Sequence, residues 1–262
     1  MNPDVLTARL TCAFSAPCAG KVHSVFARTA NLLMELPSGP RMLTLTAVSC
    51  PAVPDSICVP SDALAGLEPG IRVAMSRDTL SLPDGDHPFR QDPAWTGRII
   101  RRGHWKGIEA FLRQTEDLRC GLDGIPRPRR ERALKALCTA DAPAYIGLGC
   151  GLTPSFDDAC TSVLAVYRAA GLPAPFTIRD FSVTTDVSVR YLRLAQEGYF
   201  GDVLIRLIDA VVENSDIPGR LRELLAVGAT SGADIAMGMR FAFRNEMIIE
   251  ATCPVATESR LS

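Results

Sequence analysis

The sequence predicts an α+β protein, with a β-rich N-terminal half that is barrel-like or sandwich-like and a helical C-terminal half. Two observations lead to this prediction. Short apolar runs separated by Pro- and Gly-rich turns fill the first hundred residues, whereas longer segments with helical periodicity fill the rest. Strands that precede helices along the chain favour α+β over an alternating α/β sheet. We therefore expect two domains, residues 1–100 and 101–262.

The N-terminal half is expected to contain at least five short strands. Each run holds alternating or continuous apolar residues and is bounded by turn residues such as Pro37-Ser-Gly-Pro40. Residues 83–95, rich in proline and aspartate, are expected to form a loop. Many short strands with such turns are typical of a small barrel or sandwich. The expected strands are residues 21–27, 30–36, 42–48, 71–75 and 79–82.

The C-terminal half is expected to be helical throughout. Apolar residues recur there at intervals of three and four, as on one face of a helix. Residues 121–128 should break the first two helices apart, and Gly171 should end the third. The expected helices are residues 106–119, 129–139, 155–170, 187–199, 202–212, 218–227 and 233–249.

The composition is that of an ordinary globular protein. The chain has 262 residues, 47% of them hydrophobic and 22% charged, with a formal net charge of −1. Such a charge gives no general attraction to nucleic acid or to an anionic membrane, and we expect neither as a partner. No apolar run reaches the roughly 18 residues that a membrane-spanning helix needs, and the first residues lack the basic start of a signal peptide.

Cysteine and histidine usage gives no sign of a metal cluster. None of the nine cysteines forms a C-x-x-C pair, and there are three histidines. We therefore expect neither a zinc cluster nor a disulfide framework, and no cofactor is evident. The expected location is a reducing cytoplasm. A metal requirement stays open.

The clearest chemical signal is the glycine-rich segment GLGCGLTPSFDD, residues 147–158. Glycines at alternate positions let the backbone turn sharply and approach a ligand closely. The Thr-Pro-Ser that follows predicts a helix start, with Thr153 or Ser155 as its N-cap. A helix start offers free N–H groups and a partial positive charge, which suit a phosphate or carboxylate. We therefore expect Gly149, Gly151, Thr153 and Ser155 to bind an anionic ligand.

Asp157 and Asp158 lie in the first turn of that helix and are candidate catalytic residues. Adjacent helical residues point about 100° apart, so one aspartate should face a pocket while the other caps the helix or faces solvent. In a pocket, a carboxylate would accept a hydrogen bond from a ligand amino group or hold a cation. Helix capping alone is the alternative, because acidic residues at a helix start are favourable without any ligand.

A second segment, residues 228–238, repeats the pattern of Gly-x-Thr followed by Ser and an acidic residue. We expect Thr230, Ser231 and Asp234 to contribute to the same binding site. The alternative is again a well-capped helix, because Ser231 and Asp234 have a spacing that resembles a capping box.

The shared pattern predicts that the two helix starts converge on one cavity. The hydroxyl groups of Thr153 and Ser231 should then lie close together. If Asp158 and Asp234 share a dry pocket without a cation, the pKa of at least one of them must be raised, because burial disfavours the charged form.

His23 is a third candidate, as a proton acceptor. It lies in the expected strand of residues 21–27, with Asn31 nearby. The pKa of free histidine suits proton transfer near neutral pH. A lone histidine in a strand is more often a hydrogen-bonded structural residue, and this alternative remains open.

Taken together, these segments resemble a bacterial family of largely unknown function that includes the AllH-type subunit associated with oxamate carbamoyltransferase in purine and allantoin catabolism. The resemblance implies carbamoyl transfer between phosphate and an oxamate-like nitrogen, within an assembly of several subunits. Carbamoyl phosphate or an oxamate-like anion would then be the small substrate. The segments that carry the resemblance are residues 20–26 with Asn31 and Leu32, residues 147–158, residues 195–198, and residues 230–234 with Gly238.

Two positions depart from the family pattern. Cys150 stands where the family has Pro, and Phe156 stands where it has the Gly before the two aspartates. The ring of Phe156 is expected to crowd the helix start, which makes a different ligand an alternative. Two further readings stay open. One is a different small-acid or acyl-group enzyme on the same scaffold, and the other is a non-catalytic assembly or regulatory subunit.

Overall fold

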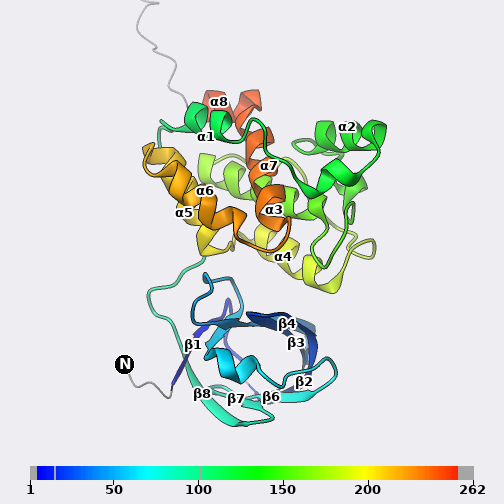
Figure 1. Ribbon diagram of the computed structural model, residues 1–262, viewed down its shortest axis with the longest axis vertical. Coiled ribbons are helices and arrows are strands. Elements are labelled where there is room, and N and C mark those ends of the chain that lie inside the picture. The colour runs from blue at the N-terminus through cyan, green and yellow to red at the C-terminus, as the bar shows by residue number, and fades with distance from the viewer. Residues whose placement is uncertain (1–4, 15, 101, 253–262) are drawn as a thin grey trace, which may run out of the picture. The chain divides into compact units, whose positions relative to one another are not determined.

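The computed structural model describes residues 5–14, 16–100 and 102–252. The chain divides into two compact units, Met1–Gly97 and Arg98–Ser262. The first unit is built from strands and the second from helices, so the predicted α+β class is confirmed (Figure 1).

The N-terminal unit is a closed β-barrel. Around the barrel the strands follow the order β1-β5-β4-β3-β2-β6-β7-β8, and pairing of β8 with β1 closes it. The β4–β5 and β1–β8 pairs are parallel and the other neighbours are antiparallel. A short 3-10 helix, η1 (Ser61–Leu64), follows β5. The strands are β1 (Leu6–Arg9), β2 (Cys18–Val25), β3 (Thr29–Leu36), β4 (Gly39–Ala47), β5 (Ser56–Val59), β6 (Arg72–Met75), β7 (Thr79–Leu82) and β8 (Gly85–Gln91).

The five predicted strands are present as β2, β3, β4, β6 and β7, and the loop prediction for residues 83–95 is wrong over Gly85–Gln91. Residues of that stretch form β8, where Pro88 stands in register with Thr79. Phe89 is the one buried residue of β8, so the strand has no apolar alternation for a sequence pattern to detect. Strands β1 and β5, with four residues each, were not among the predicted strands.

The second unit contains eight α-helices among the residues described. The expected helix over residues 233–249 is two helices, because Asn245 interrupts it and its Oδ1 accepts a hydrogen bond from Met247 N at 3.1 Å. Two 3-10 helices, η2 (Gly121–Gly124) and η3 (Ala142–Tyr145), lie before α3. The α-helices are α1 (Ile108–Gln114), α2 (Arg127–Ala136), α3 (Ser155–Ala170), α4 (Asp186–Glu197), α5 (Asp202–Glu213), α6 (Ile217–Leu225), α7 (Ser231–Phe243) and α8 (Glu246–Thr252).

Helices α3 and α7 form the centre of this unit. Nearly all of α3 is buried, and α7 packs directly against it (Figure 1). Gly238 allows the backbones to approach closely, since a Cβ there would lie 2.2 Å from the carbonyl oxygen of Ala159 and 2.2 Å from Ser162 Oγ. The absence of a side chain at residue 238 therefore fixes how close the two helices, and with them their N-termini, can lie.

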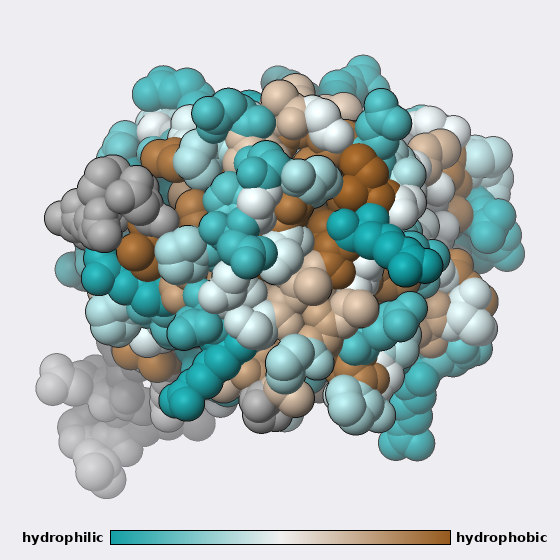
Figure 2. All heavy atoms as spheres, turned by 90° about the horizontal axis from the view of Figure 1, so that it is seen from below, coloured by the Kyte–Doolittle hydropathy of each residue, from teal (hydrophilic) through white to brown (hydrophobic). Residues whose placement is uncertain are grey.

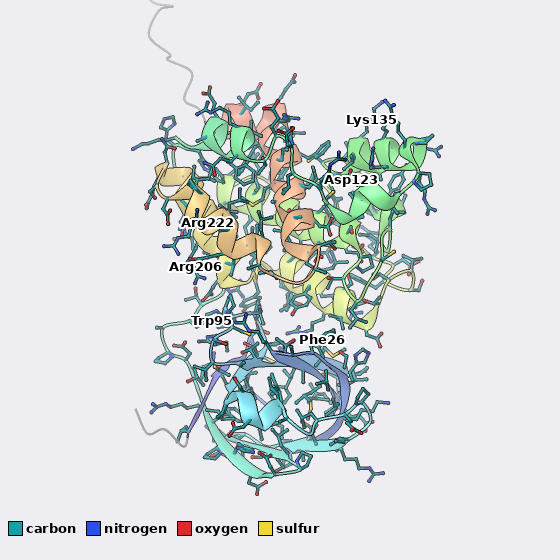
Figure 3. All side chains as sticks on the ribbon, in the orientation of Figure 1. Phe26, Trp95, Asp123, Lys135, Arg206 and Arg222 are labelled. Atoms are coloured by element: carbon teal, nitrogen blue, oxygen red, sulfur yellow. The ribbon has the colours of Figure 1, made fainter. Side chains whose placement is uncertain are left out.

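The surface mixes hydrophilic and hydrophobic side chains. Figure 2 shows one face, on which apolar residues are interspersed among polar ones. Charged side chains such as Lys135 of α2, Arg206 of α5 and Arg222 of α6 project from the helical unit (Figure 3). None of the described helices is long and apolar enough to cross a membrane. The described cysteines are free thiols.

Candidate functional site

The glycine-rich segment forms a loop that leads into α3, as the sequence predicts. We call residues 147–154 the glycine loop. Gly147, Gly149 and Gly151 have φ angles of 81°, 128° and 90°, in the region that favours glycine. A Cβ on Gly149 would lie only 2.4 Å from the backbone nitrogen of Ser155, so the loop can fold back onto the helix start only without that side chain.

The predicted N-cap of α3, Thr153 or Ser155, is wrong, and the capping alternative for α7 is not found either. The N-cap of α3 is Pro154 and that of α7 is Thr230, and neither helix has a side-chain cap. In α3 the backbone N–H of Phe156 is instead satisfied by the carbonyl oxygen of Leu148, at 3.0 Å. The hydroxyl groups near the two helix starts are therefore not needed for capping and can serve another role.

The predicted convergence of the two helix starts is confirmed by a direct contact. Thr153 Oγ1, from the glycine loop, lies 2.9 Å from Ser231 Oγ, at the start of α7. These residues are 78 positions apart in the sequence. Both side chains are partly exposed, so the contact lies where a ligand can reach it.

Asp157 is a structural anchor. Its Oδ1 accepts a hydrogen bond from Gly147 N at 2.7 Å, and its Oδ2 accepts from Thr184 Oγ1 and Ser188 Oγ, both at 2.5 Å. Burial raises the pKa of Asp157, and these three donors oppose the rise. Because its acceptor positions are used within the protein, Asp157 holds the loop in place and is poorly suited to bind a ligand.

Asp158 points to the other side of the helix, as the predicted 100° separation requires. Asp158 is buried, with 8% of the residue exposed. Burial raises its pKa to about 8, while the hydroxyls of Ser231 and Thr153 lower it and the charge of Asp234 raises it further. Its Oδ2 has no hydrogen-bond partner.

Asp234 is the counterpart of Asp158 on α7. It is fully buried, and its Oδ1 accepts a hydrogen bond from Gly121 N at 2.8 Å. Burial raises its pKa, and the nearby side chains of Thr230, Ser155 and Cys120 lower it. None of them makes a hydrogen bond of good geometry to Oδ2, which is left without a partner. The predicted rise in pKa therefore occurs in both aspartates.

A third element, η2, completes this site, although its sequence indicates only a break between helices. A Cβ on Gly121 would lie 2.1 Å from Ser155 Oγ, 3.1 Å from Asp234 Oδ2 and 3.2 Å from Thr230 Oγ1. Three oxygens from two helix starts thus fill the space that a side chain at residue 121 would need. Here the glycine is required by space, since its φ angle lies outside the left-handed region.

We call these groups the oxygen cluster. It is reciprocal, because the carboxyl of each helix lies near the first serine of the other: Asp158 near Ser231, and Asp234 near Ser155. Within the described residues, no group of three or more His, Cys, Asp or Glu side chains is arranged to hold a metal ion. The cluster consists of the carboxyl groups of Asp158 and Asp234 and the hydroxyl groups of Thr153, Ser155, Thr230 and Ser231.

The side chain of Phe156 does not enter the oxygen cluster. Its side chain is fully buried, and its ring lies 5.7 Å from the ring of Tyr145, on the core side of α3. The expectation that this ring crowds the helix start is therefore wrong. Cys150, the other departure from the family pattern, is exposed in the loop.

His23 belongs to the barrel unit. It lies at an irregularity of the β2–β3 pairing, and its Nδ1 lies 3.2 Å from Ser24 Oγ. Asn31 Nδ2 donates to the same Ser24 oxygen at 2.9 Å, and Thr44 Oγ1 donates to Asn31 Oδ1 at 3.0 Å. These contacts fit the structural alternative for His23.

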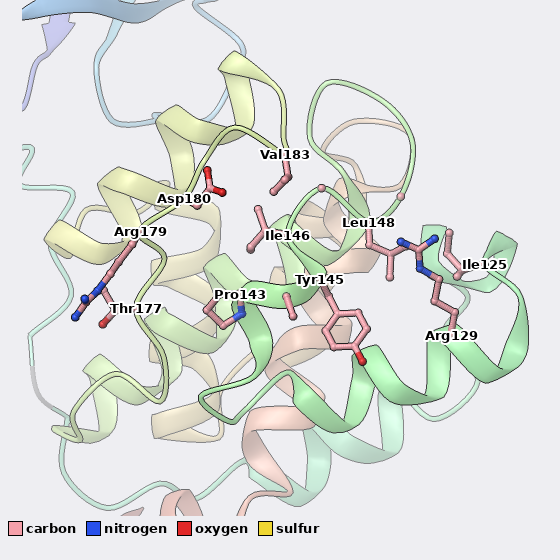
Figure 4. A pocket seen from close by; sticks show the side chains of 13 residues that line it. Ile125, Arg129, Pro143, Tyr145, Ile146, Leu148, Thr177, Arg179, Asp180 and Val183 are labelled. Carbon is pink, nitrogen blue, oxygen red and sulfur yellow. The ribbon is translucent and has the colours of Figure 1, made fainter.

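A cavity of about 910 Å³ lies on another face of the glycine loop (Figure 4). Arg129 and Arg179 lie at opposite ends of it, with the apolar side chains of Ile146 and Leu148 between them. Gly147–Gly149 is the only part of the glycine loop that lines it, and none of the cluster side chains does. The cavity and the oxygen cluster are therefore separate candidate sites.

Fold and site together define a two-unit protein, a closed β-barrel joined to a helical unit that carries a cluster of hydroxyl and carboxyl groups. Residues 4–92 match the AllH family N-terminal domain, and residues 145–243 match the family of the oxamate carbamoyltransferase subunit AllH. These matches cover most of the chain, which belongs to the AllH family. The second match spans both loops of the cluster. No solved structure matches the chain.

Proposed function

We propose that this chain is a carbamoyltransferase-related subunit that binds a small anionic substrate, carbamoyl phosphate or an oxamate-like anion, at the oxygen cluster. The observation that carries the proposal is the 2.9 Å approach of Thr153 Oγ1 and Ser231 Oγ, beside two buried carboxyl groups with unpartnered oxygens. Membership of the AllH family, described as an oxamate carbamoyltransferase subunit, supports the reaction class.

The chemistry of the cluster suits these substrates. Carbamoyl phosphate and oxamate each carry an H₂N–C=O group next to an anionic group. The four hydroxyls can donate to the carbonyl and anionic oxygens, and the positive ends of α3 and α7 favour negative charge that develops during transfer. A nucleophilic side chain is not needed, because carbamoyl transfer can proceed through positioning and charge stabilisation.

The roles of the individual residues follow from their contacts. Gly149 and Gly151 have no side chain, so the backbone at these two positions of the glycine loop can approach the substrate closely. Asp158 is the better candidate for a catalytic carboxyl than Asp157, whose oxygens already accept three hydrogen bonds. His23 remains a weaker proposal as a proton acceptor.

Binding of oxamate and of carbamoyl phosphate to the full chain, measured by calorimetry, tests the site. We expect Thr153→Val and Ser231→Ala each to weaken binding by about tenfold, or roughly 1.4 kcal/mol. Thr177→Val is the matched control, because Thr177 is exposed and lines the separate cavity. Loss of binding in Thr177→Val, with no change in the other two variants, would move the substrate site to the cavity.

We also propose that the chain works together with other protein subunits. The family description names a subunit, and a complete set of catalytic side chains is not evident in the cluster. Carbamoyl transfer from carbamoyl phosphate to oxamate should be near background with the purified chain alone. Rapid turnover without partner chains would contradict this part of the proposal and leave the binding site in place.

A further inference from the structure

The two carboxyl groups of the oxygen cluster have no positively charged partner among the described residues. Asp158 Oδ2 and Asp234 Oδ2 are both buried and have no hydrogen-bond partner. A buried carboxylate without a partner is strongly disfavoured, typically by several kcal/mol. Among the described residues, no Lys, Arg or His nitrogen lies within 4.0 Å of either carboxyl. The described part of the chain therefore supplies no positively charged partner for these two carboxyl groups.

We propose that Asp158 and Asp234 together bind one divalent cation of the hard, oxygen-preferring class, namely Mg²⁺. Two ionised carboxylates balance the charge of one such ion. They sit at equivalent positions in the first turns of α3 and α7, whose backbones are held together at Gly238. The contact between Thr153 Oγ1 and Ser231 Oγ brings the two helix starts together, and the charge of Asp234 acts on Asp158.

The remaining groups of the cluster fit the same cation. Hydroxyl oxygens accompany carboxylates at Mg²⁺ sites, and the ion usually keeps several water ligands. Thr230 is exposed, and Thr153 and Ser231 are partly exposed, which gives the ion a route in and leaves positions for water or for substrate oxygens.

This inference rests on the site of the proposed function and resolves a conflict within it. An anionic substrate next to two ionised carboxylates would be repelled. A divalent ion between them reverses the local charge and supplies a ligand position for the carbonyl and anionic oxygens of the substrate. A hydrogen-bonding substrate amino group could meet the same oxygens, but as a neutral donor it would leave the charge uncompensated.

Metal binding is measured on the full chain without substrate, so the two proposals can fail separately. Mn²⁺ is the probe for electron paramagnetic resonance and Mg²⁺ for calorimetry, at about pH 8.5, where ligand carboxylates are deprotonated. We expect one site per chain. Asp158→Asn and Asp234→Asn should each weaken it by at least about tenfold. Asp141→Asn, which alters an exposed aspartate of the same unit, should leave it unchanged.

Two glycine substitutions, one at the site and one control, test the proposal without changing either carboxylate. Gly121→Ala places a methyl group among the three cluster oxygens, whereas Gly124→Ala, in the same short helix, meets no atom within 4 Å. We expect metal binding to weaken in the first variant alone, with both variants folded by circular dichroism.

The inference is overturned if the folded chain binds neither ion at millimolar concentration, or if binding survives both asparagine variants. Oxamate binding that is equal in EDTA and in Mg²⁺, and lost in Asp158→Asn, would also overturn it in favour of the substrate amino group. Metal binding with no binding of either substrate would leave the inference standing and remove the proposed function.

Discussion

Each unit of this protein buries carboxyl groups, and Asp55 of the barrel differs from Asp158 and Asp234 of the helical unit in how its charge is compensated. In the barrel, the buried side chain of Asp55 accepts hydrogen bonds from Arg41 Nε and Nη2 at 2.8 and 2.5 Å, and from Thr11 N and Oγ1 at 2.6 and 2.8 Å. In the helical unit, Asp158 and Asp234 each keep a buried oxygen without a partner. Burial of a polar group alone is therefore a poor indicator of function. Burial without compensation is the more informative signal.

The first prediction removes the ion pair that compensates the buried carboxylate of Asp55. Arg41→Ala removes the countercharge of Asp55 and leaves a carboxylate with a fully buried side chain. We expect the free energy of unfolding to fall by about 3 kcal/mol. Urea denaturation followed by circular dichroism measures the change, with Arg72→Ala, an exposed barrel arginine, as the control. A loss no larger than that of the control would show that the pair contributes little.

The second prediction separates the two neighbouring aspartates of α3. Asp157→Ala removes the acceptor of three hydrogen bonds from the glycine loop and from the 184–188 segment. Because these are charge-assisted bonds in a buried place, we expect unfolding to become easier by about 2 kcal/mol. The same measurement on Asp158→Ala should show a smaller loss. The reverse order would mean that Asp158 is the anchor.

The third prediction leaves a further buried oxygen of the barrel without a hydrogen-bond partner. Thr44→Val removes the donor to Asn31 Oδ1 and leaves that buried oxygen unpaired, at a cost of about 1.5 kcal/mol. Thr46→Val is the matched control on β4, since Thr46 Oγ1 is itself buried without a partner. This control should be neutral or slightly stabilising. Equal losses in the two variants would refute the explanation by hydrogen bonding.

The last prediction concerns a variant that should be more stable than the parent chain, whereas the variants above should lose stability. The folded chain holds a proton on Asp158 up to about pH 8, whereas the unfolded chain releases it near the ordinary value of 3.8. The free energy of unfolding should therefore fall as pH rises from about 4 to 8, and metal-free Asp158→Asn should lose this pH dependence and be more stable than the parent above pH 8. Thermal denaturation across this range checks the prediction. A variant with an unchanged pH slope would exclude Asp158 as the titrating group.

Much of the fold could be predicted because the signals are local. The start of α3 follows from the alternate glycines and Thr-Pro-Ser, and the approach of the two loops follows from their shared pattern. The strand β8 was missed because Phe89 is its one buried residue and Pro88 normally argues for a loop.

The roles within the site depend on contacts that no local pattern reveals. Asp157 and Asp158 are neighbours in sequence, and what separates them is the presence of Thr184 and Ser188, which lie 27 and 31 residues from Asp157. Gly121 likewise gives no sign in the sequence that a side chain there would meet three oxygens of the cluster. Such roles need the fold.

The 78-residue separation of Thr153 and Ser231 also constrains when the site can form. Contacts between distant segments must wait for the chain to close a long loop, and they cannot form before the later segment exists. During synthesis, α3 emerges long before α7, so the oxygen cluster is among the last features of the helical unit to assemble. A chain that stops before residue 231 can complete its barrel and still lack half of the cluster.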